Sequence, residues 1–174
     1  SVKANNGVDF ISAAAILWIA ISVIWSLDFT TYNKSVLTFM VSGIMLPLAF
    51  IFSKIYKTEW KVPGNALQSL GIWLNVAQLF YFPFLIFLLL KAPDIFVMGY
   101  AIITGAHLFP YAWFYEEKAY AFAAGLVSIG AFLIAISVED AEMFYIPIFT
   151  ATILTFLGIS IYVSTNKKNK VIVH

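Results

Sequence analysis

The sequence predicts an all-α integral membrane protein, in which residues 1–174 form one domain of six transmembrane helices with both chain ends in the cytoplasm. Three observations lead to this fold class. Of the 174 residues, 62% are hydrophobic and 11% are charged, whereas soluble domains carry about 25% charged residues. The apolar residues form six long runs, each near the roughly 20 residues that a helix needs to cross the hydrocarbon core. The lysines fall mainly into alternate gaps between these runs.

The lysine distribution predicts the orientation of the chain. There are ten lysines and no arginine. In the six-span arrangement, the side of the membrane that holds both termini carries eight of them, and the opposite side carries only Lys34 and Lys91. The eight are Lys3, Lys54, Lys57, Lys61, Lys118, Lys167, Lys168 and Lys170. Because positive residues are enriched in cytoplasmic loops, both termini are expected on the cytoplasmic face of the cell membrane.

The six predicted spans cover residues 8–27, 36–53, 66–90, 93–114, 119–138 and 143–164. The first run exceeds the apolar core of a signal peptide, about 7–15 residues, and is interpreted as a retained helix. In the second, Pro47 removes the N–H that would bond the carbonyl of Gly43. In the third and longest run, Pro83 similarly frees the carbonyl of Leu79, which predicts a kink.

The last three spans follow the same logic. The fourth contains Pro110, which frees the carbonyl of Ala106. The fifth carries Ala121, Gly125 and Gly130, small residues at which neighbouring helices are expected to approach closely. The sixth has a proline in its first turn, where proline is tolerated. Continuously apolar stretches exclude a transmembrane barrel, whose strands alternate apolar and polar residues.

Composition excludes several classes of function. The absence of cysteine removes disulfides, thiolate catalysis and cysteine metal ligands. The two histidines, His107 and His174, are too few for a multi-histidine metal site or a bis-histidine haem in one chain. No cofactor and no metal site are therefore expected. A formal charge of +1 with dispersed lysines also disfavours nucleic-acid binding, which needs a basic stripe.

Polar side chains inside two adjacent spans form two stripes. In the fourth span, the polar residues recur at helical spacing and therefore share one face of the helix; they are Tyr100, Thr104, His107, Tyr111 and Tyr115. The third span contributes Gln68, Asn75 and Gln78. Polar groups are costly inside a membrane and therefore face protein or water. The two stripes are expected to line a polar cavity between the third and fourth helices, and they supply the candidate binding residues.

His107 is the leading functional candidate. At about 1.5 Å per residue, Asn75 and His107 both lie roughly 12–14 Å from the cytoplasmic ends of their spans, so their side chains are expected to be within reach of each other. Imidazole changes charge near neutral pH, which suits a proton-titrating or ligand-contacting group. Alternatively, His107 and the amides only link helices by hydrogen bonds, each worth on the order of 0.6 kcal/mol. A third alternative places the imidazole against lipid.

Acidic residues lie at both predicted membrane faces. Asp9 is at the cytoplasmic mouth of the first span, and Glu116 and Glu117 are at the corresponding end of the fourth. These carboxylates form either a solvated rim that balances lysines and caps the first helix, or a site in which Asp9 accepts a cation or proton on a path toward His107. The outer acidic residues 139–142 lack the glycine and spacing of a calcium loop and are expected only to cap the sixth helix.

The Gly-Ala-His-Leu-Phe-Pro segment at residues 105–110 resembles a recurring segment of a family of small uncharacterised bacterial multi-pass membrane proteins. The Leu-Pro-Leu-Ala-Phe segment at 46–50 and the pair Asn75 and Gln78 are similar to that family as well. The resemblance covers most of the chain and implies a bacterial inner-membrane protein. The family is a domain of unknown function, so the resemblance implies no activity, ligand or catalytic residue.

Three classes of function remain open. The first is transport or binding of a small solute or proton through the polar cavity. The second is a membrane-embedded enzyme acting on lipid, with His107 as general base and Glu116 or Glu117 as acid, although no nucleophile motif or metal pair accompanies them. The third is an accessory or sensory protein that binds a partner or hydrophobic ligand through its aromatic helices. The lipid bilayer is the expected partner in each case, and homo-oligomerisation is a further possibility.

Overall fold

All regular secondary structure in residues 7–58 and 68–172, which are the residues that this computed structural model describes, is helical. Its elements are α1 (Val8–Ser26), α2 (Thr31–Ser42), α3 (Met45–Tyr56), α4 (Gln68–Ala77), η2 (Gln78–Tyr81), α5 (Phe82–Lys91), η3 (Pro93–Ile95), α6 (Phe96–Phe114), α7 (Ala119–Ser137), η4 (Asp140–Glu142) and α8 (Tyr145–Ile172). The η elements are short 3₁₀ turns. The predicted all-α class is confirmed.

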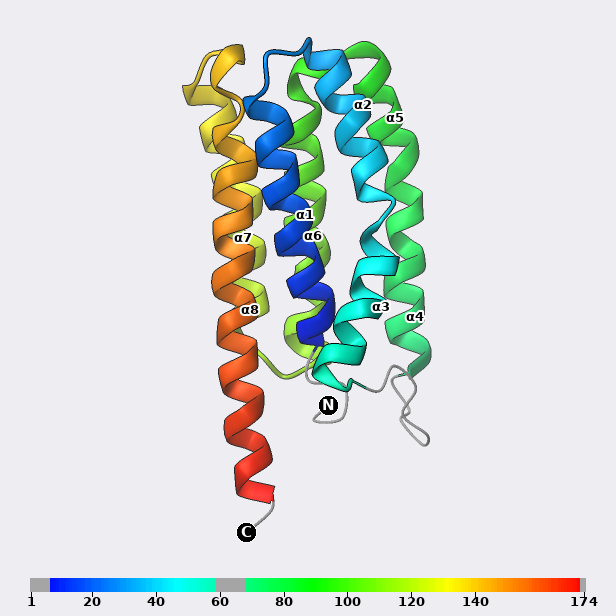
Figure 1. Ribbon diagram of the computed structural model, residues 1–174, viewed down its shortest axis with the longest axis vertical. Helices are drawn as coiled ribbons and strands as arrows, with labels where there is room; N and C mark the ends of the chain where they lie inside the picture. Colours follow the sequence, from blue (N-terminus) through cyan, green and yellow to red (C-terminus); the bar gives the residue numbers. More distant parts are fainter. Residues whose placement is uncertain (1–6, 59–67, 173–174) are drawn as a thin grey trace.

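The helices lie alongside one another along the long axis of the molecule (Figure 1). α1 begins at the lower end in this view, and α8 runs down to that end and beyond it, whereas α2 begins and α5 ends at the opposite, upper end. The ends of the elements place Lys54, Lys57 and Lys118 at the lower end and Lys34 and Lys91 at the upper end.

Four helical segments are long and apolar enough to cross a membrane, by length and composition. They are Val8–Ser26, Pro93–Phe114, Ala119–Ser137 and Asp140–Asn166. The bent pair Thr31–Ser42 and Met45–Tyr56 adds a fifth if it is counted as one span, and Gln78–Lys91 is apolar but shorter. The described residues therefore hold four or five membrane-length helices, which is compatible with a membrane protein.

Each predicted range overlaps a helix or a run of consecutive helices in the described ranges, and two helices extend well beyond their predicted spans. α2 begins at Thr31 rather than at residue 36, because Thr30 caps it by accepting the N–H of Asn33 at 3.3 Å. α8 continues to Ile172 rather than ending at residue 164. An apolar run measures the depth of the hydrocarbon layer, whereas a helix continues through polar residues, and this explains both differences.

Two of these runs are interrupted near their middle. α2 and α3 meet at a bend of 42°, where the N–H of Gly43 turns back to the carbonyl of Met40 at 3.1 Å. Pro47 lies in the first turn of α3 and cannot supply the N–H that would continue the helix past Gly43. α4 passes into η2 immediately before Pro83 and α5, in agreement with the predicted kink. Pro110, by contrast, is accommodated inside α6.

The main core lies between α1, α6, α7 and α8. Trp18, Ile21 and Trp25 of α1 are at most 2% exposed and pack with apolar residues of the other three helices. A second, smaller cluster centres on Leu88 of α5 and Phe96 of α6. The α2–α5 side of the bundle is therefore held by an apolar cluster of its own.

Small residues set the closest approach between helices. Gly105 of α6 faces α7, where an added methyl group would lie 2.9 Å from the backbone nitrogen of Ser128. Gly130 of α7 is similarly covered by the ring of Phe149 of α8. Within residues 7–58 and 68–172, a methyl group on Gly125 would meet no atom of another helix within 4 Å, so a single chain does not make the expected close contact there. Gly125 lies on a face of α7 that no neighbouring helix covers.

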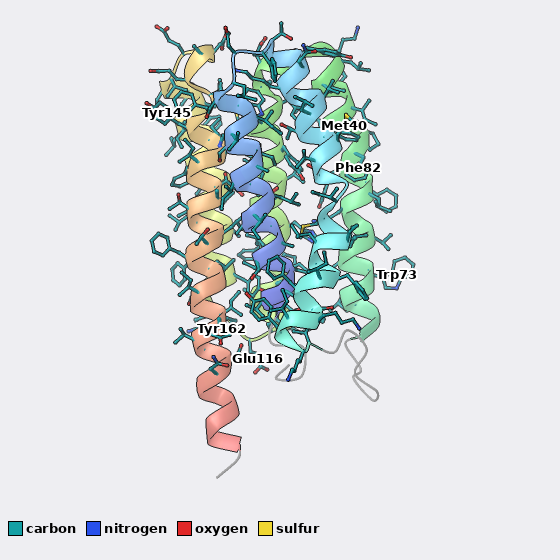
Figure 2. All side chains as sticks on the ribbon, viewed as in Figure 1. Met40, Trp73, Phe82, Glu116, Tyr145 and Tyr162 are labelled. Atoms are coloured by element: carbon teal, nitrogen blue, oxygen red, sulfur yellow. The ribbon has the colours of Figure 1, made fainter. Side chains whose placement is uncertain are left out.

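The outer surface of the bundle is strongly apolar. Phe80, Phe122, Trp73 and Trp113 project outward with exposed fractions of 78%, 72%, 67% and 67%. Figure 2 shows such side chains around the bundle, with Trp73 and Phe82 pointing away from it. Soluble monomers rarely expose contiguous apolar surface on this scale, so the surface suits a lipid environment.

Gly105→Ala is expected to destabilise the bundle by about 1–3 kcal/mol, because the methyl group overpacks the contact between α6 and α7. Gly125→Ala adds the same methyl group on an uncovered face and is expected to change stability by less than about 1 kcal/mol. The measurement is the unfolding free energy of each variant in detergent micelles, followed by circular dichroism. Equal stabilities would contradict the close packing of α6 against α7.

Candidate functional site

Asp9 is a buried carboxylate at the lower end of the bundle. It lies in the first turn of α1 and is 2% exposed. Its Oδ2 accepts the hydroxyl hydrogen of Thr58 at 2.8 Å, and its Oδ1 accepts the backbone N–H of Phe10 at 3.0 Å. A buried carboxylate needs such partners, and the positive end of the α1 dipole also favours it. The expectation that Asp9 belongs to a solvated rim is therefore wrong.

A left-handed residue at the end of α3 turns Thr58 toward this carboxylate. Lys57 has a φ of 55°, and the N–H of Thr58 bonds back to the carbonyl of Ser53 at 2.9 Å. This is the hydrogen-bond pattern of a Schellman helix end. α6 ends in the same way, with Glu116 at a φ of 54° and the N–H of Glu117 bonded back into the helix at 2.9 Å. Both helix ends thus present a polar residue to a neighbouring helix.

Two tyrosines, Tyr115 and Tyr120, lie near Asp9, and Tyr111 packs against both of them. Tyr115 and Tyr120 reach the start of α1, because a methyl group on Gly7 would lie 3.0 Å from a ring carbon of Tyr115 and 3.0 Å from the hydroxyl of Tyr120. The Tyr115 ring stacks on that of Tyr111, with centroids 5.7 Å apart, and lies 5.7 Å from that of Tyr120. The cluster therefore places phenol groups near Asp9, the one buried carboxylate of residues 7–58 and 68–172.

Tyr115 follows α6 and lies outside the membrane-length segment Pro93–Phe114. Burial raises the pKa of its phenol above the usual value of 10.0, and charge on Tyr111 and on Asp9 raises it further. The phenol is therefore neutral over the physiological pH range and remains a hydrogen-bond donor. A neutral donor near a buried carboxylate is an arrangement suited to passing a proton.

His107 is connected to this cluster through Tyr111. Its Nε2 lies 3.3 Å from the Tyr111 hydroxyl, and the two rings meet edge to face with centroids 5.3 Å apart. The imidazole is half-buried. Further up α6, the Thr104 hydroxyl donates to the carbonyl of Tyr100 at 2.9 Å, and the Tyr100 ring stacks on Trp18 of α1 at 5.2 Å. The fourth-span stripe thus leads from the lower end toward the middle of the bundle.

The third-span residues are described only in part. Gln68 and Asn75 lie on α4, but their side chains are outside the described part of the structure, so the contact of Asn75 with His107 stays a prediction. Gln78 begins the 3₁₀ turn η2 and is half-buried. The backbone of α4 approaches the ring of Phe114 at the lower end of α6. The predicted cavity between these helices therefore has one described wall, on α6.

The remaining carboxylates are not brought to His107. Glu116 is exposed at the lower end, and Glu117 accepts the hydroxyl hydrogen of Ser164 of α8 at 2.7 Å. The acidic residues within 139–142 are exposed at the upper end. In the described ranges 7–58 and 68–172, no group of three or more histidine or carboxylate side chains is arranged to hold a metal ion.

Thr58, Tyr56 and Tyr120 are members of this site that the sequence analysis missed. The Tyr56 hydroxyl lies 3.2 Å from that of Ser12, one turn above Asp9. Tyrosines near the ends of apolar runs are typical of the aromatic belt at the headgroup layer, which hides their inward contacts in a sequence. Thr58 carries no signal, because a single hydroxyl in a polar connection has no periodicity.

Thr58→Val is expected to lower the unfolding free energy by about 1.5–3 kcal/mol, because it removes a hydrogen bond to a buried charged group. Thr152→Val is the matched control, since Thr152 is exposed and bonds only the carbonyl of Ile148 in its own helix. Chemical denaturation of both variants in detergent gives the comparison. A cost no larger than that of the control would show that the Asp9 contact is energetically unimportant.

Comparison with known proteins gives the family of this chain. A family model described as "Family of unknown function (DUF7010)" matches residues 1–164. No curated protein and no solved structure matches the chain. Since the family match spans most of its length, the chain belongs to the family of unknown function DUF7010.

Proposed function

We propose that this chain is a single-domain, six-span protein of the cell membrane, with both termini in the cytoplasm, that transports or binds a small solute or proton through polar groups between its helices. The observation that supports this function best is a row of neighbouring polar and aromatic side chains, called the polar file below. It leads from the buried Asp9 through Tyr115 and Tyr111 to His107. A polar file inside an apolar bundle is where a hydrophilic species has the least costly path.

The six-span arrangement is supported by the shape and charge of the bundle. The bent pair α2–α3 and the run α4–η2–α5 extend alongside the four membrane-length helices from one end of the bundle to the other (Figure 1). The lower end carries Lys54, Lys57 and Lys118, whereas the upper end carries most of the described acidic residues. The positive-inside rule then assigns the lower end to the cytoplasm.

The chemistry of the file suits proton movement. A carboxylate, phenol hydroxyls and an imidazole follow one another, and each of these groups accepts a proton in one protonation state and donates it in the other. His107 lies seven residues before the lower end of α6 at Phe114, which is about 10 Å into the helix at about 1.5 Å per residue. A proton that enters at Asp9 is therefore carried well below the headgroup layer.

The enzyme alternative is less well supported. It requires Glu116 or Glu117 to act with His107, yet the first is exposed and the second is bonded to Ser164 on another helix. The accessory or sensory alternative rests on the aromatic surface, which serves lipid contact equally well. We therefore propose transport or binding through the polar file in preference to both.

His107→Gln is expected to reduce proton uptake into proteoliposomes to the level of protein-free vesicles, because glutamine keeps hydrogen-bonding capacity but cannot take up a proton. The measurement uses a pH-sensitive dye trapped inside the vesicles and an imposed inward pH gradient. Phe109→Ala is the control, since Phe109 lies on the same helix with 63% of its side chain exposed.

Wild-type protein and the Phe109→Ala variant should acidify the vesicle interior at similar rates. Uptake by His107→Gln at the wild-type rate would contradict a role for the imidazole in the path. Uptake by wild type no faster than by protein-free vesicles would contradict proton transport itself.

A further inference from the structure

The breaks in two neighbouring runs of helix occur at the same depth of the bundle. α2 and α3 have 12 residues each, so their junction lies about 18 Å from either end at about 1.5 Å per residue. α4 has 10 residues before η2 begins, which places η2 about 15–20 Å above the start of α4. Both interruptions therefore fall near the middle of the proposed membrane layer.

The two breaks are also close laterally. Phe39, one turn before Gly43, packs edge to face against Phe82, the residue after η2, with ring centroids 5.9 Å apart. The ring of Phe39 also packs against the small apolar cluster of α5 and α6, whereas Phe82, the first residue of α5, is exposed. The phenol of Tyr100 of α6 lies near Ser42, the last residue of α2, whose hydroxyl donates to the carbonyl of Thr38 at 2.7 Å. Three elements thus meet around the junction of α2 and α3.

The groups gathered there are polar and uncharged. Pro47 has no N–H to offer the carbonyl of Gly43, and in the described ranges that carbonyl accepts no backbone hydrogen bond outside the helices. Gly43 is exposed on the single chain. Ser42 and Tyr100 contribute hydroxyls, and the half-buried Gln78 contributes a side-chain amide from η2. Within the described ranges 7–58 and 68–172, the charged side chains lie toward the helix ends and not at this junction.

Backbone that leaves helical geometry at hydrocarbon depth is tolerated only where protein buries it or where it lines a polar space. Lipid cannot bond the carbonyl of Gly43, and a backbone carbonyl left unbonded in hydrocarbon is strongly unfavourable. The exposure of Gly43 on the single chain means that no other described element buries it. Paired helix interruptions at one depth are also how many transporters build a substrate site.

We propose that the junction of α2 and α3, together with η2, forms a water-accessible binding site for a small uncharged solute that has both hydrogen-bond donors and acceptors. The inference rests on the proposed function and places its binding site above His107 on the polar stripe of α6. The carbonyl of Gly43 accepts from the solute, the amide of Gln78 both donates and accepts, and the hydroxyl pair of Ser42 and Tyr100 borders it.

The absence of charge among these groups determines the class of solute. A charged solute would lose its hydration without an opposite charge to replace it, which is costly in an apolar layer. A polyol or amide requires only hydrogen bonds, which the junction provides. The aromatic rings of Phe39 and Phe82 give the site an apolar border suited to carbon-bound hydrogens.

The chain has no cysteine, so a single introduced thiol reports its own surroundings. Ser42→Cys and Gln78→Cys are reconstituted in vesicles and treated with a permanently charged methanethiosulfonate, which does not enter hydrocarbon. Ile129→Cys is the control, because Ile129 is 62% exposed on α7 at a similar height. We expect both site cysteines to react about tenfold or more faster than the control, since only they contact water.

Solute class is tested in the same vesicles by light scattering after mixing with glycerol, urea or myo-inositol. Wild-type protein should speed the entry of at least one of the three, and Gln78→Leu should remove that increase, whereas Thr152→Val should not. Entry of all three at the rate of protein-free vesicles would overturn the assigned solute class. Retention of the increase in Gln78→Leu would overturn the role of the amide.

The outcomes separate this inference from the proposed function. If the cysteines at 42 and 78 react no faster than the one at 129 while His107-dependent proton uptake persists, the site is wrong and the proposed function stands. If the cysteines react and are shielded by the transported solute, the site is supported. Loss of both reactivity and proton uptake would contradict both proposals.

Discussion

A polar group that enters an apolar layer must find its hydrogen-bond partner within the protein, and the rest of this structure depends on that constraint. Many hydroxyls of the long helices bond the carbonyl one turn earlier, as Ser22 does with Trp18 and Thr150 with Ile146, at 2.7 and 2.9 Å. Helical backbone satisfies itself in the same way. Exposed apolar side chains then form an outer surface that needs no water, and the charged residues collect at the two ends. The apolar surroundings therefore favour apolar side chains on the outside of the bundle and polar groups inside it or at its ends.

Two places depart from this pattern, and they are the places where we propose that the protein acts. At the lower end, a buried carboxylate is held by a threonine hydroxyl and neighbouring tyrosines, and Tyr111 leads from there to His107. At mid-height, Pro47 prevents the carbonyl of Gly43 from being bonded within its helix. Each feature carries a free-energy cost that simple helix packing would not require. The α6 stripe passes both places, since Tyr115 belongs to the lower cluster and Tyr100 reaches the α2–α3 junction.

Much of the fold could be predicted because the apolar runs and prolines act locally. Each predicted apolar run overlaps a helix or consecutive helices in the described ranges, and Pro83 correctly indicated the interruption before α5. The boundaries of α2 and α8 could not be predicted from hydropathy, since a capping hydroxyl and polar helix formers lie outside the apolar window. The burial of Asp9 could not be predicted either, because it depends on Thr58 and on tyrosines that the chain brings back from other helices. Helical spacing alone placed Tyr100, His107 and Tyr111 on one stripe, but it does not show what faces them.

Membrane insertion with both ends in the cytoplasm is the claim on which both proposals rest, and labelling of single cysteines in intact cells tests it most directly. Asn33→Cys lies at the upper end and Asn166→Cys on the lower part of α8, and both positions are exposed. The two substitutions remove the same uncharged side chain, so neither alters the charge pattern that orients the chain. A membrane-impermeant maleimide should label the cysteine at 33 in intact cells and the cysteine at 166 only after permeabilisation. Labelling of both before permeabilisation, or of the cysteine at 166 alone, would contradict this topology.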